Sequence, residues 1–404
     1  MKIAILTSGV APVPATKGGA VENLIQHILE VNEKNKSFQI DVYSIYDLKA
    51  EEEAKRYKNT KIKYFKPSFI CSNMDKVIYF GMTNVLKKKN NMKYRNILCR
   101  FEYINKIKKE LYKNDYDKVI LENHPTLLMA MKDKNYEKFK GKYYYHLHNE
   151  VNNLYGCEEI ARNSKKIMGV SNFICENIKE ACNAEESKLV SLYNCIDINK
   201  FSKDNYKDDI KEIRKKYKIA EDDIVAVFSG RLTKEKGIFE TLQAIKKVNN
   251  KKVKLLVIGA YFYGSDMKSD YLNNIKALTD GMEDRVIFTG YVDYNEIPKV
   301  YAASDFAILP SMWNEPAGLT IIEAMAMRLP VITTISGGIP EYADNTCAFL
   351  LERNENIVDE IKEKIELLVK DKDLRLEMGL KAEEKAKIYN IDNYYNNFKK
   401  IIEE

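Results

Sequence analysis

The chain has few cysteines and histidines for its length, and it lacks a long hydrophobic run. Its seven cysteines are scattered over 404 residues without a C-x-x-C pair. Scattered cysteines in odd number argue against a disulfide framework or a zinc site, so we expect reduced thiols in a cytoplasm. Four histidines give little support to a histidine-based metal site. No run approaches the roughly 18 apolar residues of a membrane span.

The N-terminus and the overall composition indicate a soluble globular protein. Residues 1–7 are apolar only briefly before a loop with glycine and proline, so we expect a first β-strand there and not a secretory signal. Apolar residues make up 45% of the chain and charged residues 31%. A chain of this length fits two domains of roughly 200 residues each.

Positive charge is concentrated in one part of the first half. Residues 51–100 contain 13 Lys/Arg against 4 Asp/Glu, interleaved with aromatic and aliphatic residues. The basic segment 55–100 could rest on an anionic membrane or hold a phosphorylated acceptor. The alternative is the solvated face of lysine-rich helices. Nucleic-acid binding is disfavoured, because no known binding motif accompanies the charge.

Short β-branched runs alternate with helical patterns along the whole chain. Expected strands are Ile3–Leu6, Ile40–Ser44, Val119–Leu121, Tyr143–Leu147, Ile167–Val170, Leu189–Leu192, Val225–Ser229, Leu255–Ile258, Val286–Phe288, Phe306–Leu309 and Val331–Thr333. Expected helices include Ala20–Val31, Ile238–Lys247, Leu319–Met327 and Ile357–Val369. This alternation predicts an α/β fold with two doubly wound, Rossmann-like domains facing across a cleft. We expect domains at 1–200 and 201–385, and a C-terminal helix within 386–404 that packs back on the first domain.

The segment 314–326 carries the strongest functional signal. Glu315 precedes a proline and a glycine, so we expect it in a loop, with Pro316 in the first turn of the following helix. Glu323 lies within the apolar run that forms this helix. A carboxylate at a helix N-terminus and a second one further along the same helix suit a sugar nucleotide. Its diphosphate would bind at the positive end of the helix dipole. The alternative is a capping glutamate and a solvated one.

Other loops that follow strands carry polar residues of matching chemistry. Arg231 and Lys236 come after the strand ending at Ser229 and suit a diphosphate leaving group, although a surface Lys/Glu cluster is the alternative. The pair Gly18-Gly19 opens a helix and allows a phosphate to approach, but alone it indicates only a tight turn.

Histidines and a D-x-D motif bear on the question of a metal. His148 follows a strand and is a candidate donor to a sugar hydroxyl or phosphate, whereas His146 is expected to be a satisfied core histidine. As a metal site this pair lacks a third ligand nearby. Asp115-Tyr116-Asp117 precedes a strand, so it is expected at the amino edge of the sheet, away from ligands. We therefore predict no metal and no other cofactor.

The ordered motifs together resemble the retaining GT-B glycosyltransferases of family 4, the "glycosyl transferases group 1". The matching segments are Gly18-Gly19, His148-Asn149, Val170-Ser171, Tyr193 to Phe201, Gly230 to Gly237, Glu315 to Leu319, Glu323 to Ala326, Pro330 to Ile332 and Gly337 to Glu341. The resemblance spans nearly the whole chain and is sparse between residues 45 and 115. Two departures, Cys195 and Ala317, affect an interdomain turn and the shape of the pocket.

The resemblance implies a hexosyltransferase-type enzyme (EC 2.4) that uses a nucleoside-diphosphate sugar, with a UDP-sugar favoured. It implies that Arg231 and Lys236 bind the diphosphate, with Gly18 and Gly19 nearby. It further implies contacts to the donor from Glu315, His148, Tyr291, Gly318, Leu319, Thr320 and Glu323. The expected acceptor is a glycan or lipid-linked molecule of cell-surface polysaccharide synthesis, handled in the cytoplasm at the inner face of the membrane. A sugar-nucleotide epimerase, a phosphorylase-like enzyme and an inactive sugar-binding protein are the alternatives.

Overall fold

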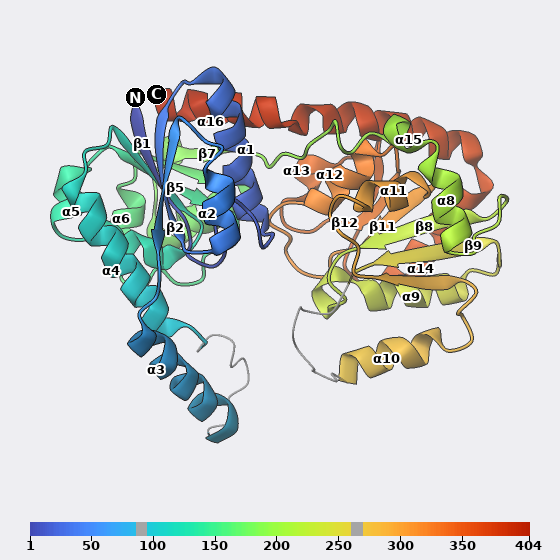
Figure 1. Cartoon of the computed structure of the whole chain (residues 1–404). Helices are drawn as coiled ribbons and strands as arrows, with labels where there is room; N and C mark the ends of the chain where they lie inside the picture. Colours follow the sequence, from blue (N-terminus) through green and yellow to red (C-terminus); the bar gives the residue numbers. More distant parts are fainter. Residues whose placement is uncertain (86–94, 260–269) are drawn as a thin grey trace. The chain divides into compact units, whose positions relative to one another are not determined.

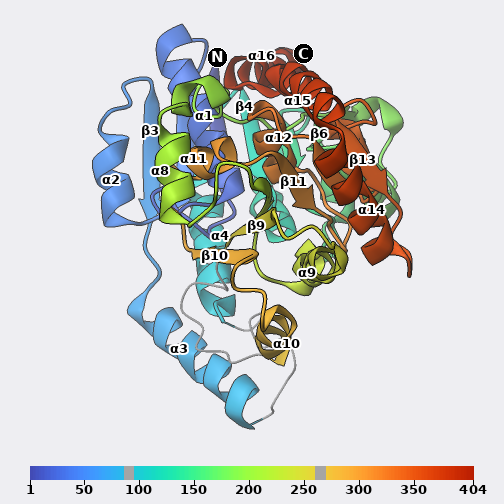
Figure 2. The ribbon, with the colours of Figure 1, turned by 90° about the vertical axis from the view of Figure 1, so that its right-hand side faces the viewer.

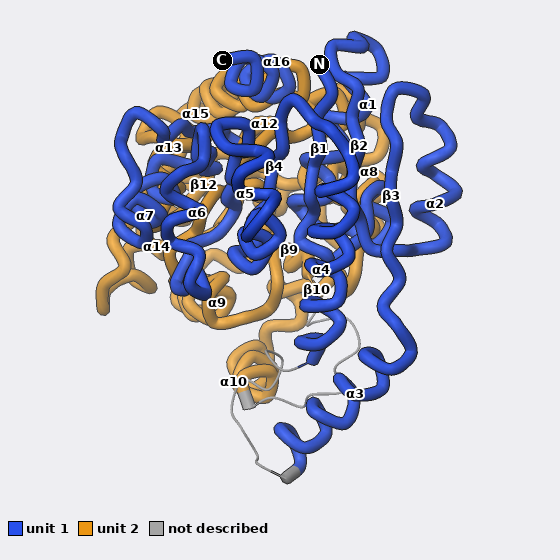
Figure 3. The backbone as a smooth tube through the Cα atoms, turned by 90° about the vertical axis from the view of Figure 1, so that its left-hand side faces the viewer, with its two compact units in different colours: residues 1–193, 394–404 blue, residues 194–393 orange. Residues whose placement is uncertain are grey.

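The computed structural model describes residues 1–85, 95–259 and 270–404, which form two compact α/β units. Unit 1 comprises residues 1–193 and 394–404, and unit 2 comprises residues 194–393 (Figure 3). The border between the units therefore lies at residues 193/194, where the sequence indicates 200/201. The chain returns to unit 1 at Tyr394.

Unit 1 is built on a parallel sheet of seven strands among the described residues. In spatial order they are β3 (Thr60–Phe65), β2 (Gln39–Ile45), β1 (Lys2–Leu6), β4 (Lys118–Glu122), β5 (Tyr143–Leu147), β6 (Lys166–Gly169) and β7 (Leu189–Ser191). Six of them lie where the sequence predicts strands. β3 was not predicted, because Lys61 and Lys63 interrupt its apolar residues at the edge of the sheet.

The helices of unit 1 connect these strands (Figure 1). They are α1 (Ala20–Asn35), α2 (Leu48–Ala54), α3 (Phe69–Phe80), α4 (Ile97–Lys113), α5 (Lys134–Lys138), α6 (Glu158–Arg162), α7 (Asn172–Cys182) and the C-terminal α16 (Ile391–Glu403). The aromatic residues of α16 are buried in this unit: the Tyr395 hydroxyl lies 2.9 Å from Asn32 Oδ1, and the Phe398 ring meets Phe38 edge-on.

Unit 2 repeats the doubly wound plan with six parallel strands among its described residues. In spatial order they are β10 (Val286–Gly290), β9 (Val253–Ile258), β8 (Ile224–Ser229), β11 (Phe306–Leu309), β12 (Val331–Thr334) and β13 (Ala348–Leu351). The helices are α8 (Asp209–Lys216), α9 (Ile238–Lys247), α10 (Asp270–Thr279), α11 (Ile297–Ala302), α12 (Leu319–Ala326), α13 (Ile339–Tyr342), α14 (Ile357–Lys370) and α15 (Lys372–Ala386). The edge strand β13 was not predicted.

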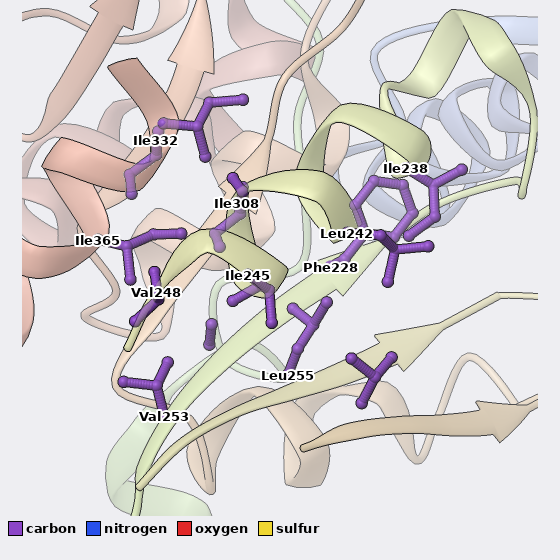
Figure 4. Packing of buried hydrophobic residues seen from close by; sticks show 14 of the residues in the cluster. Phe228, Ile238, Leu242, Ile245, Val248, Val253, Leu255, Ile308, Ile332 and Ile365 are labelled. Carbon is purple, nitrogen blue, oxygen red and sulfur yellow. The ribbon is translucent and has the colours of Figure 1, made fainter. Parts of the chain in front are cut away.

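The core of unit 2 joins the sheet to two amphipathic helices (Figure 4). α14 contributes Ile357, Ile361 and Ile365, whose spacing of four puts them on one helical face. α9 contributes Ile238, Leu242 and Ile245 in the same way. Each of these side chains stabilises the fold by about 1.5–3 kcal/mol when fully buried. The sheet is thus held rigidly enough to position the loops at its strand ends.

Each sheet has one point where the strand order reverses. In unit 1 the chain leaves β1 for β2 and β3, then returns to β4 on the other side of β1. In unit 2 it leaves β8 for β9 and β10, then returns to β11. Crevices outside the carboxyl ends of strands at such points are where open α/β sheets bind ligands.

Among the described residues, no helix is long and apolar enough to cross a membrane.

Candidate active site

A pocket of about 270 Å³, which includes open solvent space, lies at the β8/β11 crevice of unit 2. Its lining residues come from the ends of these strands, from the loops after them and from the start of α12: Phe228, Ser229, Lys236, Leu309, Ser311, Glu315, Gly318, Thr320 and Ile321. Four of the predicted site residues, Lys236, Glu315, Gly318 and Thr320, are therefore brought together.

Glu315 is the centre of the polar contacts in this pocket. Its Oε2 accepts hydrogen bonds from Lys236 Nζ at 2.6 Å and from Ser311 Oγ and Trp313 Nε1 at 2.9 Å each. The Lys236 ammonium also lies 5.6 Å from the centre of the Trp313 ring. Both charged groups are mostly buried, so the pair is more strongly coupled than a surface ion pair.

The loop that carries Glu315 is braced by the loop after β12. Gly338 donates its N–H to the Glu315 carbonyl oxygen at 2.8 Å. Gly337 has a φ of 54°, and a Cβ added there would lie 2.3 Å from the same oxygen. Only glycine fits a position with both features. The loop after β12 thus supports the site through its backbone.

The prediction for Pro316 was wrong. The helix begins at Leu319, with Gly318 as its N-cap, so Pro316 lies in the preceding loop and not in the first turn. The bond from Gly338 to the Glu315 carbonyl holds this loop outside the helix. The N–H groups of Leu319 and Thr320 are therefore the ones at the helix start, where no intrahelical partner exists.

Glu323 is buried on α12, beside the loop after β10. Its Oε1 accepts a hydrogen bond from the Tyr294 hydroxyl at 3.1 Å. Burial raises the pKa of Glu323 from its ordinary value of 4.5 to about 7, opposed by the Tyr294 bond and the Lys200 charge. The alternative of a solvated glutamate is excluded. A buried carboxyl with a raised pKa is typical of functional sites.

Arg231 and Tyr291 are not among the residues that line the pocket. Arg231 follows β8 and is exposed, and Tyr291 follows β10 with 61% of its surface exposed. Each lies after the carboxyl end of its strand, as predicted.

In unit 1, Gly18 and Gly19 precede α1. Gly19 has a φ of 112° and forms the N-cap, and a Cβ added there would lie 2.3 Å from Glu22 Oε2. The buried Glu22 carboxylate folds back over this helix start. Burial raises the pKa of Glu22 to about 6, against hydrogen bonds from backbone amides that lower it. The side chain of Glu22 thus lies close to the N-terminus that was expected to meet a phosphate.

His148 and His146 form a buried cluster with Glu122, which the sequence prediction missed. His146 Nδ1 and His148 Nε2 lie 3.0 and 3.1 Å from Glu122 Oε2. Their ligand atoms all lie within 4.8 Å of one another, so the three residues could hold a divalent metal ion. The statement that this histidine pair lacks a third ligand was therefore wrong: Glu122 stands beside His146 in the register of β4 and β5.

The cluster has a defined proton arrangement without a metal. Burial would raise the pKa of Glu122, but the two imidazoles bring it down to about 2. Burial and the neighbouring His146 lower the pKa of His148 to about 4, despite Glu122. Glu122 is thus a carboxylate at neutral pH, and His148 is neutral with its proton on Nε2. His148 therefore offers Nδ1 as an acceptor, where the sequence suggested a donor. His146 is not fully satisfied, because its buried Nε2 has no partner among the described residues.

The D-x-D motif lies at the amino edge, as predicted. Asp117 accepts a hydrogen bond from the Lys2 N–H at the start of β1, and Asp115 pairs with Lys138. Both aspartates therefore have structural partners.

The two doubly wound units and the pocket at a strand-order reversal define the GT-B class of fold. Residues 209–385 match the family model "Glycosyl transferases group 1". This segment lies within unit 2 and includes Lys236, Glu315 and Glu323. Residues 209–385 of this chain are thus similar in sequence to the group 1 glycosyltransferases.

Known proteins are similar to this chain in sequence and in fold. The chain is 25% identical over 350 residues to spore coat protein SA of Bacillus subtilis, covering 85% of this chain and 83% of that protein. It is 32% identical over 240 residues to the capsular polysaccharide biosynthesis glycosyltransferase CapM of Staphylococcus aureus, covering 56% and 58%. The crystal structure of Anabaena HepE in complex with UDP matches 100% of both chains with a TM-score of 0.76 and 18% identity.

Proposed function

We propose that the chain transfers a sugar from a UDP-sugar to a hydroxyl group of a glycan or lipid-linked acceptor, with retention of the anomeric configuration. The observation that carries this proposal is the Lys236–Glu315 pair at the start of α12, inside the β8/β11 pocket. In this pair, Lys236 is the cation that would bind the diphosphate, and Glu315 is the carboxylate that would bind the sugar. The structurally similar HepE, solved with UDP and with UDP-glucose, supports the choice of donor.

In the proposed reaction, the bond between the anomeric carbon and the diphosphate oxygen breaks. A bond from the acceptor oxygen to that carbon forms on the same face. The acceptor proton passes to the departing diphosphate oxygen, so no protein nucleophile is required. Lys236, Arg231 and the N–H groups at the start of α12 would stabilise the charge that develops on the diphosphate.

Other residues receive roles as part of the same proposal. Glu323 would accept hydrogen bonds from the ribose hydroxyls, Tyr291 would meet the base, and His148 would contact the donor sugar. Gly18 and Gly19 would allow the diphosphate to approach the first unit. Fixed positive charge from protein groups would make a metal unnecessary.

The acceptor is proposed to be membrane-linked, and α3 supports a peripheral contact from the cytoplasmic side. Phe69, Ile70, Met74, Val77 and Phe80 are between 51% and 84% exposed. At 100° per residue these five positions fall on one face of α3. Asp75 lies on the opposite side, where its carboxylate caps the N–H groups of Leu98 and Cys99 on α4.

The helix α3 extends away from the sheet of its unit (Figure 2). A contiguous exposed apolar face of this kind marks an interaction site more often than a solvated surface. Lys87, Lys88 and Lys89, which carry much of the predicted basic character, lie outside the described residues.

Trp313 makes the test of donor binding direct. It is the single tryptophan of the chain, and its indole N–H bonds to Glu315. UDP should change the intrinsic fluorescence in a saturable way, whereas UMP should bind more weakly because it lacks the second phosphate. Release of UDP from a UDP-sugar only when an acceptor extract is present would support transfer. Interconversion of the UDP-sugar without acceptor would indicate an epimerase, and binding without turnover an inactive protein.

A further inference from the structure

The strand-order reversal of unit 1 carries a group of polar residues that the proposed donor chemistry does not use. The loop after β1 contains Ser8, and the loop after β4 contains Asn123 and His124. Because β1 and β4 are neighbours in the sheet, these loops follow adjacent strands at the carboxyl end of the sheet, where open α/β sheets bind ligands. The strand-order reversal between β1 and β4 is the counterpart in unit 1 of the one between β8 and β11 in unit 2.

Arg100 reaches the loop after β1 from the start of α4. Its Nη1 donates a hydrogen bond to the carbonyl oxygen of Ser8 at 3.3 Å. The side chain is half-buried, and burial lowers its pKa. Removing a guanidinium from water is costly unless an anion compensates the charge.

No carboxylate among the described residues pairs with Arg100. Arg56, Arg214 and Arg328, in contrast, each form an ion pair with Asp or Glu. The residues 86–94 that precede α4 include no acidic residue. The carboxylates of Glu22 and Glu122 at the same sheet edge are engaged by backbone amides and by two histidines.

His124 adds a neutral hydrogen-bond donor beside Arg100. Its Nδ1 accepts the N–H of Thr126 at 3.3 Å, which leaves the ring proton on Nε2. Burial, and then the charge of Arg100, lower the pKa of His124 to about 4. The imidazole is therefore uncharged at neutral pH, and its Nε2–H can donate without adding positive charge.

We propose that Arg100 and His124 form an anion subsite that binds a phosphate or carboxylate group of the acceptor. This inference rests on the proposed transferase function and adds the chemical class of the acceptor to it. Arg100 supplies the charge and two parallel donors, and His124 supplies a third. A neutral acceptor would leave the guanidinium uncompensated, so the subsite selects against neutral sugars.

The test measures binding of small acceptor-like probes to the full chain by isothermal titration. Glucose 1-phosphate, glucuronate and methyl glucoside are compared in the presence of saturating UDP, which blocks the donor pocket. The variants are Arg100→Gln, Arg100→Lys and the matched control Lys109→Gln, which removes one exposed charge from the same helix.

One or both anionic probes should bind more tightly than methyl glucoside, and the comparison between them distinguishes a phosphate from a carboxylate. Arg100→Gln should weaken anion binding about tenfold to a hundredfold, the range expected for a charged hydrogen bond. Arg100→Lys should retain part of it, and Lys109→Gln should match the parent.

Equal binding of neutral and anionic probes, absence of anion binding by the parent, or anion binding unchanged in Arg100→Gln would overturn the subsite. UDP binding followed by Trp313 fluorescence is the separate readout for the donor site. If the parent does not bind UDP, the proposed transferase function is contradicted. If the parent binds UDP but shows no anion preference that depends on Arg100, only the subsite is contradicted. Intact UDP binding by Arg100→Gln also shows that the variant is folded.

Discussion

The ammonium group of Lys236 lies 2.6 Å from Glu315 Oε2, although 79 residues separate the two in the chain. Lys236 ends the short turn after β8, and Glu315 lies in the loop after β11, so their contact follows from the pairing of these two strands. The pair keeps a cation and a carboxylate in fixed positions before any ligand binds. Such preorganisation lowers the reorganisation needed when charge develops on a leaving group.

Lys236→Ala should remove most transfer activity. Loss of one well-placed donor to developing charge costs about 3 kcal/mol, or a hundredfold and more in rate. The affinity for UDP, followed by Trp313 fluorescence, should fall as well. Arg231→Ala should act in the same direction.

Lys234→Ala is the matched control for both variants, because Lys234 is exposed in the same turn and does not line the pocket. Near-parental turnover by Lys236→Ala, with the fold intact, would contradict the diphosphate assignment.

The free energy of unfolding should carry a pH dependence that originates at Glu323. Its carboxyl binds a proton more tightly in the folded chain, with a pKa of about 7, than in the unfolded chain, where 4.5 applies. The contribution of Glu323 to the free energy of unfolding is therefore fully present below pH 4.5. It is lost as the pH rises towards and through 7. Between these two pH limits the free energy of unfolding should fall by roughly 3 kcal/mol through this group.

Glu323→Gln should lose this contribution while keeping an oxygen that accepts the Tyr294 hydroxyl. Urea denaturation of both proteins at pH 5 and pH 8 measures it: the variant should be stabilised relative to the parent at pH 8 more than at pH 5. A constant stability difference between the two proteins would show that Glu323 titrates normally.

Glu122→Gln should reduce transfer without changing UDP affinity. The carboxylate accepts N–H groups from His146 and His148 at Oε2, and the amide nitrogen of glutamine would replace Oε1, which lies 3.3 Å from His146 Nδ1. One imidazole must then change tautomer or lose its bond, which disturbs the acceptor nitrogen that His148 offers to the sugar. We expect turnover to fall by about tenfold or more, since a hydrogen bond to a charged group contributes roughly 1.5–3 kcal/mol.

Asp115→Asn is the control for this experiment, as it removes a carboxylate of the same unit at the opposite edge of the sheet. Its activity should match that of the parent. Unchanged turnover in Glu122→Gln would mean that the cluster serves packing alone.

The strands of the interior could be predicted because buried parallel strands consist of uninterrupted apolar residues, as in Val225 to Phe228. The edge strand β3 offers no such signal, because Lys61 and Lys63 interrupt its apolar residues. Glu315, Glu323 and Lys236 were found because glycine, proline and apolar neighbours place them locally. Glu122 could not be found in this way: its partner His146 is adjacent only through strand register, and a single sequence does not state which strands pair.

Transfer should be independent of added metal. Lys236, Arg231 and the α12 N-terminus already offer positive charge, and the D-x-D motif is engaged at the amino edge. EDTA should leave turnover unchanged, and zinc should inhibit if it reaches Glu122, His146 and His148. Abolition by EDTA with recovery in magnesium or manganese would contradict this prediction.

Membrane association should depend on the exposed apolar face of α3. Replacing Phe69 and Val77, which are 84% and 72% exposed, with serine should lower co-sedimentation with phosphatidylglycerol-containing vesicles by about tenfold or more. An apolar side chain of this size contributes about 1.5–3 kcal/mol when it is fully buried. Because both side chains are exposed in the free chain, the double variant should retain its stability and its affinity for UDP.

Two comparisons separate the apolar from the electrostatic part of this contact. Leu380→Ser, on α15 of unit 2, removes an apolar side chain that is 59% exposed and should have no effect. Lys87, Lys88 and Lys89 changed to glutamate should weaken binding to anionic but not to neutral vesicles, with each charge contributing about 1 kcal/mol near the surface. Binding should also weaken with salt, since exposed charges are screened beyond about 8 Å at physiological ionic strength. If the parent does not sediment with anionic vesicles even at low salt, or if the α3 variant sediments as well as the parent, then the exposed face of α3 does not meet a membrane.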